Sequence, residues 1–118
     1  MAQNKTYGTF EVLRLNSIFD GDTFNVDIAS LHPLIGDNIA VRIARIDTPE
    51  INSFNPEQVT KAAFARDFLK NLLSAAKKIT LENVSRDKYF RIVADVFIDG
   101  KDLAAQIVAA NHGIYKKY

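Results

Sequence analysis

Residues 10–28 read FEVLRLNSIFDGDTFNVDI, and this stretch decides the fold. Apolar and polar side chains mostly alternate from Thr9 to Ile18 and again from Phe24 to Ile28, which is the pattern of half-buried strands. The dipeptide Asp20-Gly21 lies between the two runs and is typical of a tight turn. The stretch therefore predicts a β-hairpin.

Beyond the hairpin, the chain contains three more runs that predict strands. Residues 39–46 predict a third strand, residues 79–84 a fourth and residues 92–98 a fifth. The enlarged connection before the third strand contains His32-Pro33 and Gly36-Asp37, and these pairs predict a loop.

Two helices are predicted between and after these strands. Asn55 is suited to cap a helix, Pro56 fits its first position, and Gln58 stands where a capping box requires it. Apolar residues, Phe64 among them, then recur at helical spacing as far as Ala76, opposite a polar face made of Lys61, Arg66, Lys70 and Asn71. Asp102 predicts the start of a shorter, final helix.

This order of elements predicts an α+β fold that is mainly a β-barrel. A five-stranded Greek-key barrel of OB type with two packed helices fits best, although an open sheet would show the same strand pattern. The length of 118 residues and the apolar content of 47% suit one domain over residues 1–118, because two domains would each be too small to bury a core.

Composition excludes several classes of protein. The formal net charge of +1 creates no overall field that would attract nucleic acid or a membrane, so any such affinity must come from local charge. The absence of Cys excludes disulfides, thiolate metal sites and thiol catalysis. No apolar run approaches the roughly 20 residues of a membrane span, and the chain as given begins without a signal peptide.

Carboxylates beside two turns are the first candidate functional residues. Asp20 and Asp22 flank the hairpin turn, and Asp47 and Glu50 belong to the segment DTPE at residues 47–50. Each segment alone is compatible with an ordinary turn. Because both segments end adjacent strands, their carboxylates are expected to meet at one rim, where they would suit a hard cation such as Ca²⁺.

Cationic residues form the second candidate group. Alternation along the third strand predicts that Arg42 and Arg45 lie on opposite faces, so at least one of them needs a charged partner or covers core surface with its stem. The segment RDKYFR at residues 86–91 is either a solvated loop or a binding site for the phosphate and base of a nucleotide.

These segments, taken in order, resemble the signature of the staphylococcal nuclease (thermonuclease) family. The resemblance rests on DGDT at 20–23, on Arg42 followed by IDTPE at 46–50, on DKYFR at 87–91 and on DGK at 99–101. It extends from about Phe10 to Gly113. It implies an OB-fold barrel and a calcium-dependent phosphodiesterase that acts on DNA and RNA, single-stranded or frayed, as a monomer without a membrane partner. Relatives with an enlarged loop before the third strand favour an exported protein.

The resemblance also implies a role for each matching residue. Asp22 and Asp47 would bind calcium through their carboxylates and Thr48 through its backbone carbonyl, with Asp20 in the outer shell. Glu50 would hold or deprotonate the attacking water. Arg42 and Arg91 would contact the scissile phosphate through their guanidinium groups. Three further side chains would contact the substrate, namely those of Lys88, Tyr89 and Tyr115.

The residues themselves agree with this chemistry. Attack on a phosphodiester increases its negative charge, so cations are needed where that charge grows, and Arg binds two phosphate oxygens at once. Neither His32 nor His112 lies in these motifs, and both are expected to be solvated. A binding module on the same fold that does not cut is the main alternative, but such a module has no need of Glu50. A barrel that uses calcium only for stability would leave Arg42 and Arg91 unexplained.

Overall fold

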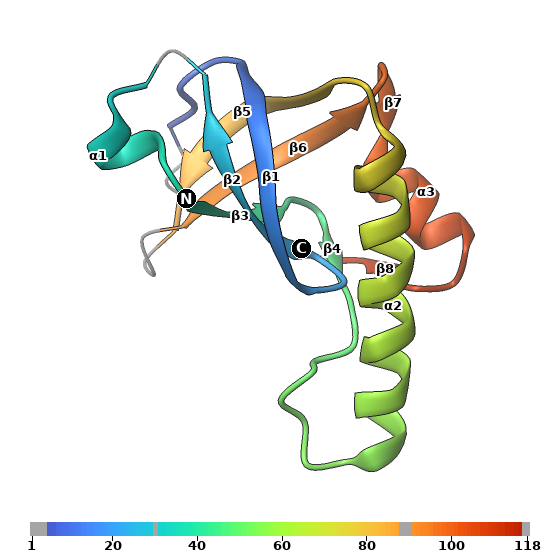
Figure 1. Ribbon diagram of the computed structural model, residues 1–118. Helices are drawn as coiled ribbons and strands as arrows, with labels where there is room; N and C mark the ends of the chain where they lie inside the picture. The colour runs from blue at the N-terminus through green and yellow to red at the C-terminus, as the bar shows by residue number, and fades with distance from the viewer. Residues whose placement is uncertain (1–4, 30, 88–90, 117–118) are drawn as a thin grey trace.

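Long strands dominate the computed structural model, which describes residues 5–29, 31–87 and 91–116. Strands β1 (Phe10–Asp20) and β2 (Thr23–Ile28) pair antiparallel and form the predicted hairpin (Figure 1). The register pairs Asp20 with Thr23, and it shifts at three places along β1. Such irregularities bend a strand and increase its twist, which helps a sheet to curl.

Five strands close into a barrel. Strands β3 (Ile39–Ile43), β5 (Ile79–Arg86) and β6 (Ile92–Ile98) extend the hairpin in the order β3-β2-β1-β5-β6, and a parallel pairing of β3 with β6 joins the two ends. The predicted α+β class and the five-stranded OB-like barrel are therefore confirmed. The remaining strands β4 (Ile46–Asp47), β7 (Lys101–Asp102) and β8 (Ile114–Tyr115) have two residues each and are too short to show a sequence period.

Two helices begin where the sequence predicts them. Helix α2 (Pro56–Ala75) is capped by Asn55, whose Oδ1 accepts a 2.9 Å hydrogen bond from the amide of Glu57. Helix α3 (Leu103–Ala109) is capped by Asp102. In Figure 1 the C-terminal part of α2 lies against the barrel, whereas its N-terminal part projects beyond it. No helix in the described part of the chain is long and apolar enough to cross a membrane.

Two local predictions were wrong. The predicted loop at residues 32–37 contains a one-turn helix, α1 (Pro33–Gly36), because the His32 ring accepts a hydrogen bond from the amide of Leu34 at 3.1 Å. The third strand ends at Ile43, because Arg45 adopts a positive φ of 75° and the chain turns before β4. Since Arg45 lies outside the strand, the argument that placed Arg42 and Arg45 on opposite faces does not apply.

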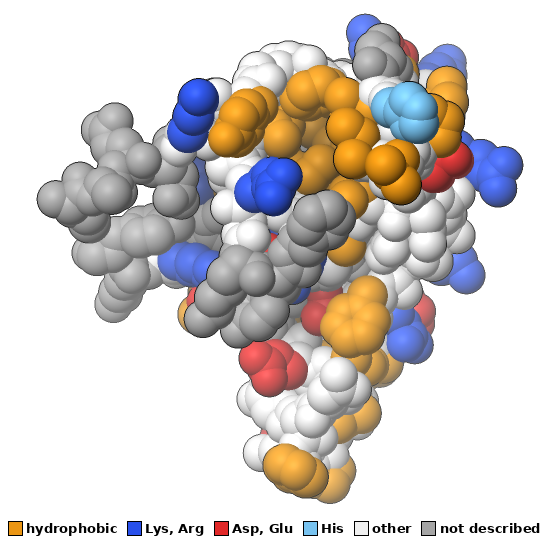
Figure 2. All heavy atoms as spheres, turned by 90° about the vertical axis from the view of Figure 1, so that its left-hand side faces the viewer, with side chains coloured by type: hydrophobic (Ala, Val, Ile, Leu, Met, Phe, Trp, Pro, Cys, Tyr) orange, Lys and Arg blue, Asp and Glu red, His pale blue; other side chains and the backbone are white. Residues whose placement is uncertain are grey.

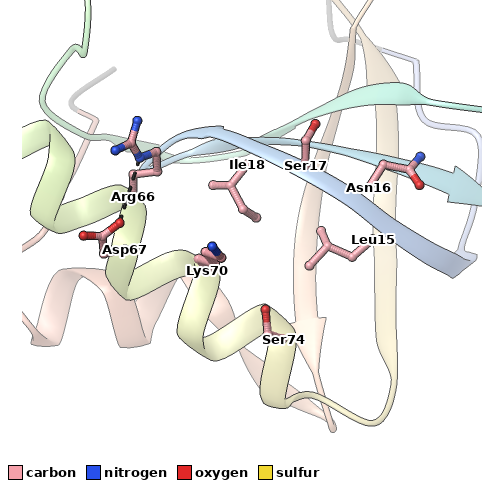
Figure 3. A pocket seen from close by; sticks show the side chains of 8 residues that line it. All are labelled: Leu15, Asn16, Ser17, Ile18, Arg66, Asp67, Lys70 and Ser74. Atoms are coloured by element: carbon pink, nitrogen blue, oxygen red, sulfur yellow. Dashed lines mark ion pairs between the residues drawn. The ribbon is translucent and has the colours of Figure 1, made fainter.

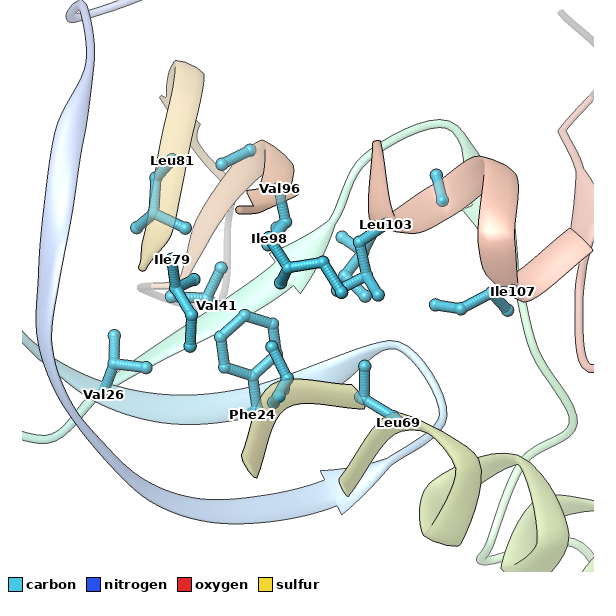
Figure 4. Packing of buried hydrophobic residues seen from close by; sticks show 14 of the residues in the cluster. Phe24, Val26, Val41, Leu69, Ile79, Leu81, Val96, Ile98, Leu103 and Ile107 are labelled. Atoms are coloured by element: carbon cyan, nitrogen blue, oxygen red, sulfur yellow. The ribbon is translucent and has the colours of Figure 1, made fainter. Parts of the chain in front are cut away.

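The core fills the barrel and continues under α2 and α3. The ring of Phe24 is fully buried in the centre of the core, and Leu69 of α2 lies on one side of it, as Figure 4 shows. Leu103 and Ile107 of α3 extend the cluster. Burying each such side chain stabilises the fold by about 2 kcal/mol. The prediction that Phe64 belongs to the packed face of this helix was wrong, because its side chain is 63% exposed. The buried positions of α2 are Ala62, Ala65, Leu69 and Leu73.

Candidate active site

A pocket of about 270 Å³ opens beside the turn of the β1–β2 hairpin. It draws its walls from the hairpin, from β3, from the segment that follows β4 and from the residue before β6. The residues that line it are Phe19, Asp20, Asp22, Thr23, Arg42, Asp47, Thr48, Glu50, Ile51, Asn52 and Arg91. Carboxylates from two turns that are 25 residues or more apart in the sequence thus share one pocket, as the sequence predicts.

Barrel pairing brings Asp22 to Arg42. The register of β2 on β3 pairs Thr23 with Arg42, and the Asp22 carbonyl accepts a 2.8 Å hydrogen bond from the amide of Ile43. The Asp22 side chain is buried, and its Oδ1 accepts a 3.0 Å hydrogen bond from the Thr23 hydroxyl. The carboxylate is therefore fixed by the sheet on which it lies.

Gly21 lets this turn approach two other parts of the chain. A Cβ atom at position 21 would lie 2.8 Å from Cβ of Ala65 in α2 and 3.0 Å from the Cβ and Oγ1 atoms of Thr48. Real Cβ atoms do not approach other heavy atoms so closely, so only Gly fits here. The close approach holds Asp22 and Thr48 on neighbouring walls of the pocket.

Arg42 joins the two carboxylates that the resemblance assigns to calcium. Its Nη2 atom lies 3.3 Å from Asp22 Oδ2 and 2.9 Å from Asp47 Oδ1. The guanidinium also donates to the carbonyls of Ile43 and Ile46, at 2.7 and 3.0 Å. Its side chain is only 14% exposed, so Arg42 is held firmly with one edge directed at the carboxylates.

Asp20 adds a third carboxyl group with unusual acidity. Its Oδ1 accepts a 3.1 Å hydrogen bond from the amide of Asp22. Burial, followed by the hydrogen bond and the negative charge of the neighbouring Asp22 side chain, raises the pKa of Asp20 from 3.8 to about 6. Asp20 therefore titrates closer to neutral pH than an ordinary Asp does.

Thr48 and Glu50 follow β4 and line another wall of the pocket. Oγ1 of Thr48 is buried next to Gly21 and has no hydrogen-bond partner among the described residues. Glu50 is exposed at the pocket, and its backbone carbonyl accepts a 3.3 Å hydrogen bond from the amide of Ser53. Its carboxylate can therefore reach solvent and a bound substrate alike.

Arg91 completes the pocket from the barrel side. Asp87 accepts hydrogen bonds from the Arg91 amide at 3.0 Å and from its Nε at 2.7 Å, which orients the guanidinium. Lys88 and Tyr89, the predicted substrate contacts between these two residues, lie outside the described part of the chain. The structure therefore supplies two guanidinium groups to a pocket that also holds four carboxyl groups.

Three other positions with predictions lie outside the pocket. Tyr115 pairs with Ile46 in the small β4–β8 sheet, is 47% exposed and does not line the pocket. His32 is exposed, as predicted. His112 is not fully solvated, because its ring packs 4.7 Å from that of Phe68, so that prediction was wrong.

Sequence reasoning missed two features of this region. Phe19 is 51% exposed on the pocket rim, and its place directly before Asp20 was the available signal. Arg45, for which the sequence indicates a charged partner without identifying it, pairs with Asp102 at 2.9 Å and with Asp95 at 2.8 Å, and these hydrogen bonds hold its pKa above the usual value. Its positive φ gives no sequence signal, since such residues are usually Gly, Asn or Asp.

The pocket offers oxygen donors of the kind that a hard cation prefers. In the described ranges, no three His, Cys, Asp or Glu side chains form a group that could hold a metal ion. However, Asp22 and Asp47 place carboxylate oxygens within 3.3 Å of one Arg42 nitrogen, so they already share a single positive charge. Carboxylate and carbonyl oxygens at 2.3–2.6 Å are what Ca²⁺ requires, and its flexible coordination accepts water in the remaining positions.

Comparison with known proteins adds an independent finding. A family model described as staphylococcal nuclease homologue matches residues 40–117. No curated protein matches the chain. The matched range begins at the start of β3, so it includes Arg42, Asp47, Glu50 and Arg91, whereas Asp22 lies before it.

Proposed function

The chain belongs to the staphylococcal nuclease homologue family, and on that premise we propose that it is a calcium-dependent nuclease. It hydrolyses phosphodiester bonds of DNA and RNA with little sequence selectivity. The observation that carries the proposal is the arrangement of Asp22 and Asp47 around one nitrogen of Arg42, in a pocket that also contains Glu50 and Arg91.

The charge of the pocket supports a metal requirement. Four carboxyl groups line it, and only two guanidinium groups do, so near neutral pH the lining is net negative. A phosphodiester would be repelled from such a lining. A bound divalent cation would neutralise this excess of negative charge. The groups that would hold the cation are the carboxylates of Asp22 and Asp47 and the carbonyl of Thr48.

Each charged side chain then has a role in hydrolysis. A Ca²⁺ ion held by Asp22, Asp47 and Thr48 would supply positive charge beside the phosphate. Glu50 holds the attacking water and accepts its proton, and its exposure at the pocket is compatible with this exchange. Arg42 and Arg91 stabilise the charge that grows on the phosphate oxygens, and a planar fork does this better than an ammonium group.

Existing contacts keep both arginines in place for that role. The carbonyls of Ile43 and Ile46 hold Arg42 independently of its carboxylate partners, and Asp87 orients Arg91. Groups positioned before the reaction cost no reorganisation during it. Because these contacts would reach phosphate rather than base edges, the proposed enzyme selects little for sequence. It favours single-stranded or frayed strands, whose backbone can enter a small pocket.

Release of acid-soluble nucleotides from heat-denatured DNA tests the proposal. We expect release with Ca²⁺, weaker release with Mg²⁺, and none once a chelator is added, because Mg²⁺ demands a stricter octahedral geometry than these turns offer. Addition of Ca²⁺ in excess of the chelator should restore the activity. Full activity in chelator would refute calcium dependence.

A non-catalytic nucleic-acid-binding module is the second candidate. It is favoured by one observation, namely that no group of three metal-ligating side chains is found within the described ranges. Such a module would bind denatured DNA and release no nucleotides with any cation. The same assay, read together with DNA binding, therefore distinguishes the two candidates.

A further inference from the structure

A second pocket, with a volume of about 290 Å³, shares Arg91 with the candidate active site. Most of its lining is apolar and comes from the N-terminal segment, α1 and the starts of β1, β3 and β6. The lining residues that matter here are Tyr7, Phe10, Ile35, Ile39, Arg86 and Arg91. Figure 2 shows hydrophobic side chains gathered, with Lys and Arg among them, on the face that carries α1.

Backbone contacts fix both sides of this pocket. The amide of Tyr7 donates to the carbonyl of Val84 at 2.7 Å, and the amide of Val84 donates to the carbonyl of Gly8 at 3.3 Å. These bonds hold the Tyr7 segment along β5. On the other side, α1 carries Ile35. The helix lies so close to Leu31 that a Cβ atom at position 36 would be only 2.7 Å from Cβ of Leu31, and Gly36 avoids this clash.

Cations surround the apolar lining. Arg86 and Arg91 line the pocket, and Lys5 Nζ lies 5.6 Å from the centre of the Tyr7 ring. Asp87 pairs with Arg91 at 2.7 Å and orients its guanidinium. Apolar and aromatic walls beside positive charges suit a flat, weakly polar ring that is attached to an anion. A nucleobase joined to a phosphate has this chemistry.

We propose that this pocket binds the base of the nucleotide next to the phosphate held at Arg91. The inference rests on the proposed nuclease function and names a base subsite for it. Arg91 is the link, because one guanidinium borders both the phosphate and the base. The volume is at the small end for ligand sites, so it suits one base and not a longer segment. The enlarged connection between β2 and β3 supplies Ile35 and therefore builds the subsite.

A larger pocket between β1 and α2 is a weaker candidate. It has a volume of about 530 Å³, and Figure 3 shows Leu15 and Ile18 of β1 facing Arg66 and Lys70 of α2 across it. Asp67 lies 4.0 Å from Arg66 and offsets part of that charge. No residue lines both this pocket and the candidate active site, so nothing connects it to the reacting phosphate.

Two substitutions on α1 give a matched test. Ile35→Ser removes an apolar wall, and the side chain is 50% exposed, so the fold should tolerate the change. Leu34→Ser is the control, because Leu34 is the neighbouring residue, is 85% exposed and does not line the pocket. Tyr7→Ala is a second test variant, since the hydrogen bond from the Tyr7 amide does not depend on its side chain. Thermal melting checks that each variant is folded.

The substrates are a single-stranded oligodeoxynucleotide and a sugar–phosphate strand of the same length that carries no bases. The measured quantity is the ratio of kcat/KM for the two strands in the presence of Ca²⁺. The wild type should prefer the strand with bases, and Ile35→Ser and Tyr7→Ala should each reduce that preference by about fivefold, within the range found for stacking of one base. Leu34→Ser should leave the ratio unchanged.

Other outcomes would overturn the inference. If Ile35→Ser and Tyr7→Ala leave the ratio unchanged while the wild type cleaves DNA, the pocket holds no base and the nuclease proposal stands. If they slow cleavage of both strands equally, they act through the position of Arg91 and not through a base. If the wild type cleaves neither strand, the proposed function itself fails and the subsite fails with it.

Discussion

Replacing Asp20 by Asn should remove a pH dependence of stability that the structure builds into the candidate active site. Asp20 is packed beside Asp22, and its Oδ1 accepts a hydrogen bond from the Asp22 amide. The Asn side chain has the same shape and keeps that acceptor. It carries no charge at any pH, so the substitution removes the titration while leaving the contact in place.

The size of the effect follows from the pKa. Burial and the nearby Asp22 raise the pKa of Asp20 from 3.8 to about 6 in the folded protein, so the folded state binds this proton more tightly than the unfolded state does. Stability is therefore highest below the unfolded pKa and falls as the pH rises through the folded pKa. A pKa change of this size corresponds to about 3 kcal/mol of unfolding free energy, as an order of magnitude.

Urea unfolding in chelator, from about pH 4 to pH 7, measures the effect. The stability of Asp20→Asn relative to the wild type should rise by about 3 kcal/mol over this range. Asp27→Asn is the control of opposite sign, because hydrogen bonds from the Asn16 side chain and the Asn38 amide lower the pKa of Asp27. Its relative stability should stay low across this whole range, because Asp27 loses its charge only below its ordinary pKa of 3.8. A difference between Asp20→Asn and the wild type that stays constant with pH would refute the reasoning.

Three further predictions concern metal, phosphate and stability. Ca²⁺ with a nucleotide should raise the melting temperature, and the Asp22→Asn, Asp47→Asn double variant should stay folded and lose most of that rise in thermal scanning, since a ligand of the native state stabilises it; an unchanged rise would mean that calcium binds elsewhere. Arg91→Lys should lower kcat at least tenfold in the DNA assay, because it loses the planar fork; an unchanged kcat would remove Arg91 from the chemistry. Arg45→Met should destabilise the fold by about 1–2 kcal/mol in urea unfolding, since bonds to Asp95 and Asp102 at 2.8 and 2.9 Å are lost from a partly exposed side chain; no change would show that this pairing is neutral.

Features that depend on local sequence were predictable. The hairpin, the long strands and the starts of α2 and α3 follow from side-chain period and from the capping groups of Asn55 and Asp102, which act over a few residues. The meeting of the two carboxylate turns was also predictable, because strand ends that are adjacent in a sheet lie at one rim.

Features that depend on tertiary contacts were not predictable. The helix α1 needs a ring nitrogen of His32 as its cap, which composition does not reveal. The two-residue pairing of β4 with β8 shows no period. Phe64 has helical spacing but lies outside the buried stripe of α2, which consists of Ala62, Ala65, Leu69 and Leu73, so periodicity alone could not place it.

The contacts of Arg42 illustrate the same limit within the site. The sequence indicates that a cation on β3 needs a partner, but alternation does not identify that partner. The pairing of Thr23 with Arg42 across β2 and β3 brings Asp22 to the guanidinium, and the turn after Ile43 brings Asp47 to its other side. Both are consequences of barrel closure.

The rate at which Glu50→Gln cleaves heat-denatured DNA, compared with the wild type in Ca²⁺, tests the central claim most directly. The substitution keeps the size and hydrogen-bonding capacity of the side chain and removes the proton acceptor. We predict that kcat falls by about 100-fold or more, while binding of a nucleotide in Ca²⁺ is retained. A kcat within about tenfold of the wild type would contradict the account, because a difference below about 1.4 kcal/mol of barrier leaves no room for Glu50 as the base.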